Sequence, residues 1–160
     1  MEIKKVGVVG CGLMGSGITQ VCAQAGFETI VHELDESVLQ NGTARIDKSL
    51  SRLVQKEKIS ELDKASAQKL IKTTTDLRKL KNVDLIIEAA SEDIAIKRSI
   101  FKTLDEECGP ATIFATNTSS LSVIDIAART GRTDKFCGLH FFNPVPAMPL
   151  VEVVRTRTTS

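Results

Sequence analysis

The sequence predicts an α/β fold with a doubly wound, mostly parallel sheet that carries helices on both faces. Short β-branched runs alternate with longer segments of helical period, which is the pattern of repeated βαβ units. A glycine-rich turn, Gly10-x-Gly12-x-x-Gly15, joins the first such run to the first helical segment. The 160 residues are about the length of one domain, and we expect no domain boundary inside residues 1–160.

The first half of the chain alternates strands and helices in a regular order. The predicted strands are residues 5–10, 28–33 and 71–74, and the predicted helices are residues 12–25, a long helix after 35–37, and residues 60 to about 70. Asp35 or Ser37 can cap the long helix, in which Ile46 and Leu50 mark one apolar face. Ser60 opens a possible capping box for the helix that follows it.

The second half continues the alternation. The predicted strands are residues 83–88, 112–116, 136–141 and 150–154, and the predicted helices surround residues 96–104 and 121–128. Ile96, Ile100 and Leu104 recur every four residues and predict the apolar face of the first of these helices. Prolines at 144, 146 and 149 predict an extended connection between the last two strands.

The amino-acid composition argues against several classes of protein. The chain has 21 basic and 20 acidic residues and lacks an arginine-rich tract with interleaved aromatics, so we expect no nucleic-acid partner. It contains no apolar run of about 18 residues and no signal-peptide pattern, so we expect a cytoplasmic protein without a membrane span. The four cysteines show no C-x-x-C spacing, so neither a metal site nor a redox pair is predicted.

Each glycine of the turn has a physical role in dinucleotide binding. Gly10 permits the tight turn, Gly12 lets a pyrophosphate approach the backbone, and Gly15 lets helix and strand pack closely. The N-terminus of the following helix offers unpaired N–H groups to the phosphates. Because a strand precedes the motif and a helix follows it, the sequence predicts a Rossmann-type dinucleotide site.

An acidic residue at the end of the second strand selects the cofactor. Glu33 can accept hydrogen bonds from both hydroxyls of the adenosine ribose, and Asp35 is the nearby competitor. A 2′-phosphate about 4 Å from that carboxylate would be repelled by ~4 kcal/mol per charge pair at an effective dielectric of ~20. Residues 6–44 contain no lysine or arginine to offset this repulsion, so NAD is predicted over NADP.

One of the two histidines, His140, precedes Glu152 by twelve residues along the chain. Histidine exchanges protons near neutral pH, and a carboxylate on its other ring nitrogen fixes its tautomer. A histidine and a glutamate on neighbouring strands are more often structural than catalytic, so the pair by itself leaves both interpretations open.

A basic stripe, defined as Arg45, Lys48, Arg52 and Lys56, follows one face of the long helix, and Ser49 lies on the same face. The default interpretation is a solvated surface. The alternative is a platform for an anionic ligand such as the phosphates of coenzyme A.

Two segments are specific enough to support a family resemblance. Together with the glycine turn and Glu33, the segments Asn117-Thr-Ser-Ser-Leu and His140-Phe-Phe-Asn-Pro-Val-Pro make the chain resemble the N-terminal domain of the L-3-hydroxyacyl-CoA dehydrogenases, including the short-chain 3-hydroxybutyryl-CoA enzymes. The resemblance covers essentially the whole chain. It implies NAD-dependent oxidation of L-3-hydroxyacyl-CoA to 3-ketoacyl-CoA.

The resemblance also implies roles for individual residues. His140 would be the acid/base, Glu152 its orienting partner, and Ser119 the group that binds the reacting oxygen. The implied cofactor contacts are Gly10, Cys11, Gly12, Leu13, Met14, Gly15, Glu33, Glu92, Lys97, Ser119 and Asn143, and the implied substrate contacts are Ser49, Lys56 and Ser119. At position 33 the family's usual aspartate is replaced by the longer glutamate.

Members of this family continue into a helical second domain that closes over the substrate and forms most of a homodimer interface. Because residues 1–160 do not contain that domain, we expect them to bind NAD with little turnover. Two other functions stay open, namely a non-catalytic NAD-binding module and a related dehydrogenase that acts on free hydroxy acids or sugars.

Overall fold

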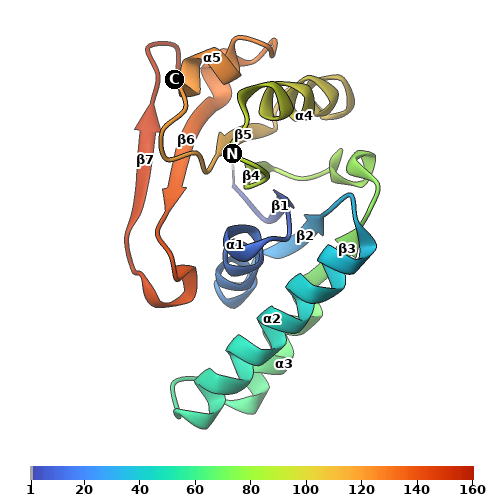
Figure 1. The fold of residues 1–160 in the computed structure, drawn as a ribbon, viewed down its shortest axis with the longest axis vertical. Coiled ribbons are helices and arrows are strands. Elements are labelled where there is room, and N and C mark those ends of the chain that lie inside the picture. Colours follow the sequence, from blue (N-terminus) through green and yellow to red (C-terminus); the bar gives the residue numbers. More distant parts are fainter. Residues whose placement is uncertain (1) are drawn as a thin grey trace.

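The protein, described over residues 2–160 in a computed structural model, forms one seven-stranded sheet in the order β3-β2-β1-β4-β5-β6-β7 (Figure 1). The strands are β1 (Lys5–Val9), β2 (Glu28–His32), β3 (Ile71–Thr74), β4 (Leu85–Glu88), β5 (Ile113–Thr116), β6 (Phe136–Phe141) and β7 (Val151–Arg155). All neighbouring strands are parallel except β6 and β7, which are antiparallel. The predicted doubly wound, mostly parallel sheet is therefore confirmed.

Helices cover both faces of this sheet. They are α1 (Leu13–Gln24), α2 (Glu36–Gln55), α3 (Glu61–Leu70), α4 (Ile94–Glu107) and α5 (Val123–Ala127), with short 3₁₀ turns η1 (Leu77–Leu80), η2 (Thr133–Lys135) and η3 (Val145–Ala147). Helices α1 to α3 lie on one side, and α2 and α3 form a hairpin that projects beyond the sheet (Figure 1). Helices α4 and α5 lie on the other side, and the antiparallel β6–β7 pair forms one edge.

The two faces bury separate apolar cores because side chains alternate along each strand. On the α1 side, Val8 and Val31 pack with Ile18 of α1. On the α4 side, the rings of Phe101, Phe114 and Phe136 contact one another, with centroid separations of 4.6 to 6.4 Å. Both faces of the central strands are covered, which explains their nearly continuous apolar sequences.

Helix caps follow the predicted chemistry. The Asp35 carboxylate accepts hydrogen bonds from the backbone N–H groups of Ser37 and Val38, so Asp35 rather than Ser37 caps α2. Ser60 and Asp63 form a reciprocal capping box at the start of α3, as the sequence predicted. These caps fix where the α2–α3 hairpin begins and turns.

Three local predictions were wrong. Strand β4 begins at Leu85 rather than at residue 83, and α5 covers Val123–Ala127 rather than residues 121–128. The proline-containing connection is not extended throughout, because it contains the turn η3, which packs on α1 through contact of Val145 with Gly17. Proline presets a φ that suits a 3₁₀ turn as well as an extended segment, so the proline pattern could not distinguish them.

The predicted apolar face of α4 is right for Leu104 and for Ile100, which packs against the core, but wrong for Ile96. Ile96 is 46% exposed, whereas Lys97, Phe101 and Leu104 are fully buried. The buried face of α4 therefore includes Lys97, which a search for periodic apolar residues does not detect. Lys97 can be buried because its ammonium group forms an ion pair with the Glu88 carboxylate.

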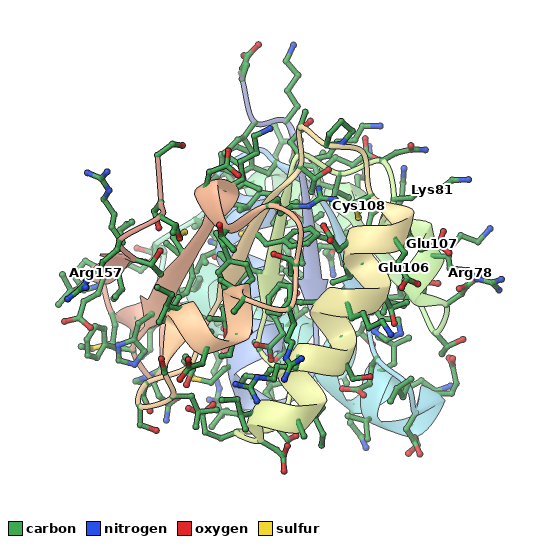
Figure 2. All side chains as sticks on the ribbon, turned by 90° about the horizontal axis from the view of Figure 1, so that it is seen from above. Arg78, Lys81, Glu106, Glu107, Cys108 and Arg157 are labelled. Atoms are coloured by element: carbon green, nitrogen blue, oxygen red, sulfur yellow. The ribbon has the colours of Figure 1, made fainter. Side chains whose placement is uncertain are left out.

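Most charged side chains lie on the outer surface, although Glu88, Lys97 and Arg132 are buried. Figure 2 shows Arg78, Lys81 and Glu107 extending outward on the α4 side, whereas Cys108 lies beside the core. Within residues 2–160, no helix is both long enough and apolar enough to cross a membrane.

Candidate dinucleotide and catalytic site

The glycine turn connects β1 to α1 at the carboxyl edge of the sheet, where strand order reverses between β1 and β4. Gly10 has a φ of +98°, which disfavours any residue with a Cβ. A Cβ at Gly15 would lie 1.9 Å from the Gly10 carbonyl oxygen, so only glycine allows α1 to approach the turn this closely. At Gly12, which caps α1, an added Cβ would meet nothing within 4 Å, so the space in front of the helix N-terminus is open.

A fourth glycine, which the sequence reasoning missed, supports this turn from outside. A Cβ at Gly42 of α2 would lie 2.2 Å from Cys11 Sγ and 2.4 Å from the Cys11 carbonyl oxygen. The Cys11 side chain is buried, and its Sγ lies 4.0 Å from the Leu39 carbonyl oxygen. An unexplained glycine inside a helical pattern was the available signal for this contact.

Glu33 follows β2 directly and lies beside the turn. Its carboxylate accepts a hydrogen bond from the Cys11 N–H at 2.9 Å and another from the Leu34 N–H at 2.9 Å. Asp35 is already used as the α2 cap, so of the two acids only Glu33 contacts the glycine turn. The contact joins the end of β2 to the start of α1.

His140 and Glu152 are paired directly across the β6–β7 ladder. His140 Nδ1 and Glu152 Oε2 are 2.8 Å apart, and this bond leaves Nε2 as the ring nitrogen that is available to a ligand. The His140 side chain is 21% exposed, and its ring lies 4.6 Å from the ring of Phe142. Strand pairing thus supplies the geometry that the twelve-residue spacing could only permit.

The active-site cleft, as we call the cavity of about 390 Å³ beside His140, gathers many of the predicted residues. Its lining includes the predicted residues Met14, Glu92, Lys97, Ser119, His140 and Asn143, together with Ala89, Ala90, Asn117, Phe141 and Phe142, which were not assigned a role from sequence. Most of these residues lie at or just after the ends of β4, β5 and β6, and Met14 and Lys97 come from the first turns of α1 and α4, so they share the carboxyl edge of the sheet.

A buried ion pair adjoins this cleft, which Lys97 lines. Lys97 Nζ lies 2.7 and 3.0 Å from the two carboxylate oxygens of Glu88, and both side chains are at most 1% exposed. The Glu88 carboxylate also accepts hydrogen bonds from the Thr116 hydroxyl at 2.6 Å and the Ala90 N–H at 2.8 Å. This satisfied pairing explains the buried Lys97 on α4. Sequence reasoning treated Glu88 only as the end of a strand, although an acid ending an apolar run was a usable signal.

Glu92 connects the ion pair to the predicted oxygen-binding residue. Its Oε2 lies 3.4 Å from Lys97 Nζ, and its Oε1 accepts hydrogen bonds from the Thr118 hydroxyl and, at 3.3 Å, from the Ser119 N–H. Partial burial raises the pKa of Glu92, but the Thr118 hydrogen bond and the Lys97 charge outweigh it and leave the pKa below its usual range. Glu92 is therefore an anion near neutral pH, and it holds the Ser119 backbone against the cleft.

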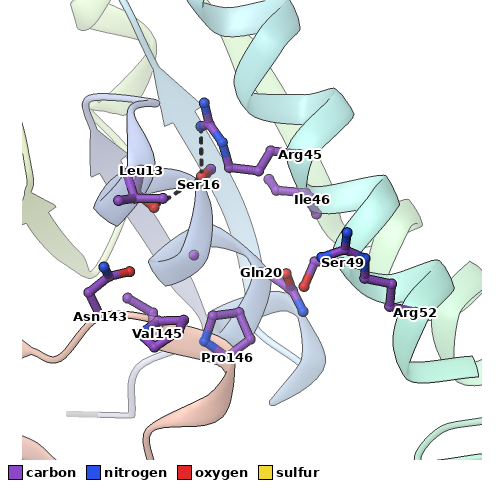
Figure 3. Close-up of a pocket in the computed structure, with 12 residues that line it drawn as sticks. Leu13, Ser16, Gln20, Arg45, Ile46, Ser49, Arg52, Asn143, Val145 and Pro146 are labelled. Atoms are coloured by element: carbon purple, nitrogen blue, oxygen red, sulfur yellow. Dashed lines mark hydrogen bonds between the residues drawn. The ribbon is translucent and has the colours of Figure 1, made fainter. Parts of the chain in front are cut away.

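The basic stripe on α2 faces a separate groove. Arg45, Lys48, Arg52 and Lys56 are exposed, and they line this groove with Ser49 opposite the prolines that follow β6. A second hollow, shown in Figure 3, lies between α1, α2 and Asn143 and includes Ser49, Arg45 and Leu13. Arg45 Nη1 lies 3.2 Å from Ser16 Oγ there. Ser49 and Lys56 are thus not brought into the active-site cleft with Ser119, although Asn143 lines both that cleft and the hollow of Figure 3.

The cysteines have the character of core residues. Cys11, Cys22 and Cys108 are buried, and Cys137 is partly buried, all as free thiols. Burial raises the pKa of Cys11 to about 11 and that of Cys22 to about 12, so these thiols carry little thiolate at neutral pH. Within residues 2–160, no group of three or more potential ligands among His, Cys, Asp and Glu could hold a metal ion.

Comparison with known proteins agrees with this geometry. Residues 5–160 match the family described as 3-hydroxyacyl-CoA dehydrogenase, NAD binding domain. The chain is 47% identical over 156 residues to a 3-hydroxybutyryl-CoA dehydrogenase of Clostridioides difficile, covering 98% of this chain and 56% of that protein. It is 42% identical over 165 residues to the mitochondrial hydroxyacyl-coenzyme A dehydrogenase of Rattus norvegicus, covering 99% of this chain and 52% of that protein.

Solved structures give the same result. The crystal structure of (S)-3-hydroxybutyryl-CoA dehydrogenase PaaH1 from Ralstonia eutropha superposes with a TM-score of 0.96 at 46% identity, covering 99% of this chain and 56% of that one. The chain thus spans about half the length of the relatives it matches. The glycine turn, the sheet order and these matches together place the chain in the family of 3-hydroxyacyl-CoA dehydrogenase NAD-binding domains.

Proposed function

We propose that residues 1–160 bind NAD and supply the acid/base group for reversible oxidation of an L-3-hydroxyacyl-CoA, with a short chain such as 3-hydroxybutyryl as the preferred acyl group. The observation that carries the proposal is that His140, hydrogen-bonded to Glu152, lines the same cleft as Ser119, Glu92 and Asn143. The relatives named 3-hydroxybutyryl-CoA dehydrogenase support the substrate class.

The residues of the turn fit a dinucleotide. Open space at Gly12 and the N-terminus of α1 would accept the pyrophosphate, and Glu33 would accept hydrogen bonds from the adenosine ribose. Each Glu33 oxygen accepts one backbone hydrogen bond and keeps a lone pair for a ribose hydroxyl. A 2′-phosphate would meet a carboxylate here, which favours NAD over NADP.

The cleft residues would divide the chemistry as follows. When bound, NAD⁺ accepts a hydride from C3 of the substrate. His140 Nε2 would take the proton of the 3-hydroxyl, and Glu152 on Nδ1 would stabilise the imidazolium that forms. The Ser119 hydroxyl would bond the oxygen whose charge changes, while Glu92 holds the Ser119 backbone in place. In the reverse direction the imidazolium returns the proton.

The basic stripe supports a coenzyme A substrate. Its cations and Ser49 line a groove next to the residues that follow His140 on the chain, so phosphates bound there would lie on the same side as the active-site cleft. Lys56 and Ser49 would contact the coenzyme A, with Lys48 and Arg52 adding positive potential. A dehydrogenase for free hydroxy acids would gain nothing from this groove.

NAD binding can be tested on residues 1–160 directly by titration with NADH. We expect saturable binding that weakens about tenfold or more in Glu33→Ala, because two charge-assisted hydrogen bonds are lost. Glu36→Ala, an exposed acid in the first turn of α2, is the matched control and should bind as the parent does. Failure of the parent chain to bind NADH would refute the proposal.

Activity is tested with acetoacetyl-CoA and NADH. Residues 1–160 alone are expected to show little turnover, and rapid turnover by this chain would contradict that. In the protein as encoded, including any residues after Ser160, His140→Gln should lower turnover about 100-fold or more and leave NADH affinity nearly unchanged. Equal turnover of free 3-hydroxybutyrate and its thioester would favour the alternative hydroxy-acid dehydrogenase. The cytoplasmic location and the homodimer expected from sequence remain predictions.

A further inference from the structure

The strand that carries His140 is held unequally by its two neighbours. The β5–β6 ladder contains three pairs and ends at Thr116 opposite Gly138. The β6–β7 ladder contains five pairs and continues to Phe141 opposite Val151. The last three residues of β6 therefore have a backbone partner strand on the β7 side only.

The side chain of Asn117 takes the place of the missing strand. Its Oδ1 accepts a hydrogen bond from the Phe141 N–H at 2.8 Å, one residue beyond His140. The Asn117 backbone N–H donates to the Glu88 carbonyl oxygen at 2.8 Å, so this residue is itself attached to β4. One residue thus connects β4 and β5 to the end of β6.

This connection lies in the wall of the active-site cleft, which Asn117 and Phe141 both line. Ser119 follows β5, and Glu92, which holds the Ser119 backbone, follows β4. His140 and Glu152 both belong to the two-stranded end of β6 and β7. Two-stranded ribbons twist more than wider sheets and are only marginally stable by themselves, so the pair needs an anchor to stay in register with Ser119.

We propose that Asn117 is a positioning residue: its side-chain oxygen fixes the end of β6, and thereby sets the His140–Glu152 pair relative to Ser119. The structural part of this proposal is independent of the enzyme activity, whereas its effect on turnover rests on the proposed function. Asn117 also lines the cleft, so the competing role is a ligand contact through its side-chain nitrogen.

Two isosteric variants separate these roles. Asn117→Asp keeps an oxygen that can accept from the Phe141 N–H and loses the amide donor, whereas Asn117→Leu loses both. A positioning role predicts that Asn117→Asp keeps the Phe141 hydrogen bond and the turnover that Asn117→Leu loses. A ligand contact through the nitrogen predicts that both variants are impaired alike.

The structural part is tested by amide hydrogen exchange in ¹⁵N-labelled residues 1–160 without ligand. We expect the Phe141 amide to be protected in the parent and in Asn117→Asp, and to exchange at least about tenfold faster in Asn117→Leu. The Ala115 amide of β5 reports global stability and should change little. An unprotected Phe141 amide in the parent chain overturns the proposal even if Asn117→Leu fails to fold.

The functional part is tested by kcat and KM in the protein as encoded. A misplacement near 1 Å can cost ~100-fold in rate, so Asn117→Leu should lower kcat at least about tenfold with a much smaller change in the KM for NADH. Asn117→Asp should recover most of that loss. Equal losses in both variants, or a loss confined to KM, would assign Asn117 to ligand binding and reject the positioning role. Normal Phe141 protection with no turnover in the parent protein would refute the proposed function while leaving the structural part intact.

Discussion

At the scale of single residues, the most consequential feature is the buried pair of Glu88 and Lys97. Each charge would be costly to bury alone, and the Thr116 hydroxyl and the Ala90 N–H complete the hydrogen bonding of the carboxylate. Lys97 of this pair lines the active-site cleft, so both the stability of the fold and the shape of the cleft depend on the pair.

Removal of one partner should therefore cost more than removal of both. We expect Lys97→Met to lower the free energy of unfolding by about 3–5 kcal/mol, because the Glu88 carboxylate loses its counter-charge inside the core. The double variant with Glu88→Gln should be more stable than Lys97→Met alone, and so less destabilised than the sum of the two single variants. Urea unfolding of all four proteins measures the coupling, and strict additivity would show that the charges do not interact.

A second buried ionisable group has no partner. His32, at the end of β2, is 4% exposed, and neither ring nitrogen has a hydrogen-bond partner among residues 2–160. Burial lowers its pKa below the usual range, although the charge of the adjacent Glu33 and, more weakly, the nearby Thr75 backbone and Asp76 charge oppose the shift. The folded protein therefore binds a proton at His32 less readily than the unfolded chain does.

This difference predicts a pH dependence of stability. As pH falls below about 6.5, the unfolded chain protonates first, so the free energy of unfolding should fall by up to ~1.4 kcal/mol per pH unit until the folded histidine also protonates. His32→Met should flatten the curve between pH 7 and 5. Both proteins should lose further stability below about pH 4.5, because carboxylates such as Asp84, whose pKa is lowered in the fold by the Lys4 and Lys5 N–H groups, protonate first in the unfolded chain. An identical slope in His32→Met between pH 7 and 5 would exclude His32 as its source.

At the scale of elements, the contact between α2 and the glycine turn depends on a missing side chain. Gly42→Ala would normally stabilise a helix by ~1 kcal/mol, but here the Cβ meets Cys11 at 2.2 Å. We expect a net loss of about 1–3 kcal/mol and weaker NADH binding, because α2 must move away from the turn. Asn41→Ala, at the exposed neighbouring position, should affect neither thermal unfolding nor NADH affinity. A Gly42→Ala variant more stable than the parent protein would show that α2 can move away from the glycine turn without cost.

A single arginine from a later segment, Arg132, binds the C-terminal end of helix α4. Arg132 donates from Nε to the Asp105 carboxylate at 2.6 Å, and its other nitrogens bond the carbonyl oxygens of Asp105, Cys108 and Gly109. Its guanidinium also lies 4.5 Å from the centre of the Phe114 ring. A planar group with several donors thus satisfies the last carbonyls of the helix.

Lysine cannot reproduce this arrangement. Arg132→Lys should lower the free energy of unfolding by about 2–4 kcal/mol, because several charge-assisted hydrogen bonds lose their donors. Arg129→Lys, which alters an exposed arginine close by, should change stability by less than about 0.5 kcal/mol. Denaturant titration compares the two variants, and similar values would mean that the arginine hydrogen bonds contribute little.

At the scale of the whole molecule, the candidate site draws on both halves of the sheet. The glycine turn and Glu33 follow β1 and β2, whereas Ser119 and His140 follow β5 and belong to β6. A ligand that spans the carboxyl edge would therefore connect segments that the chain brings together only by folding.

Cofactor binding should accordingly stabilise the whole chain. NADH at about 100 times its Kd should add ~2.7 kcal/mol and raise the midpoint of thermal unfolding by roughly 5–10 °C. NADPH at the same concentration should raise it less, because its 2′-phosphate faces Glu33. Equal shifts with the two cofactors would remove the assigned role of Glu33 in cofactor choice.

Local patterns in the sequence determined the alternation of strands and helices, the capping box at Ser60, and the glycine turn, because these depend on residues close together along the chain. The same patterns misplaced Ile96 of α4 and missed Lys97, which is buried because it meets Glu88 of another element. Tertiary structure alone decided the Gly42–Cys11 contact and the bond from Asn117 to Phe141, and it supplied the strand register for the His140–Glu152 pair that the resemblance had implied. Each of these contacts joins segments that are far apart in the sequence, so their spacing along the chain does not determine the distance between them. That distance is fixed only by strand register and by the close packing of helix on sheet.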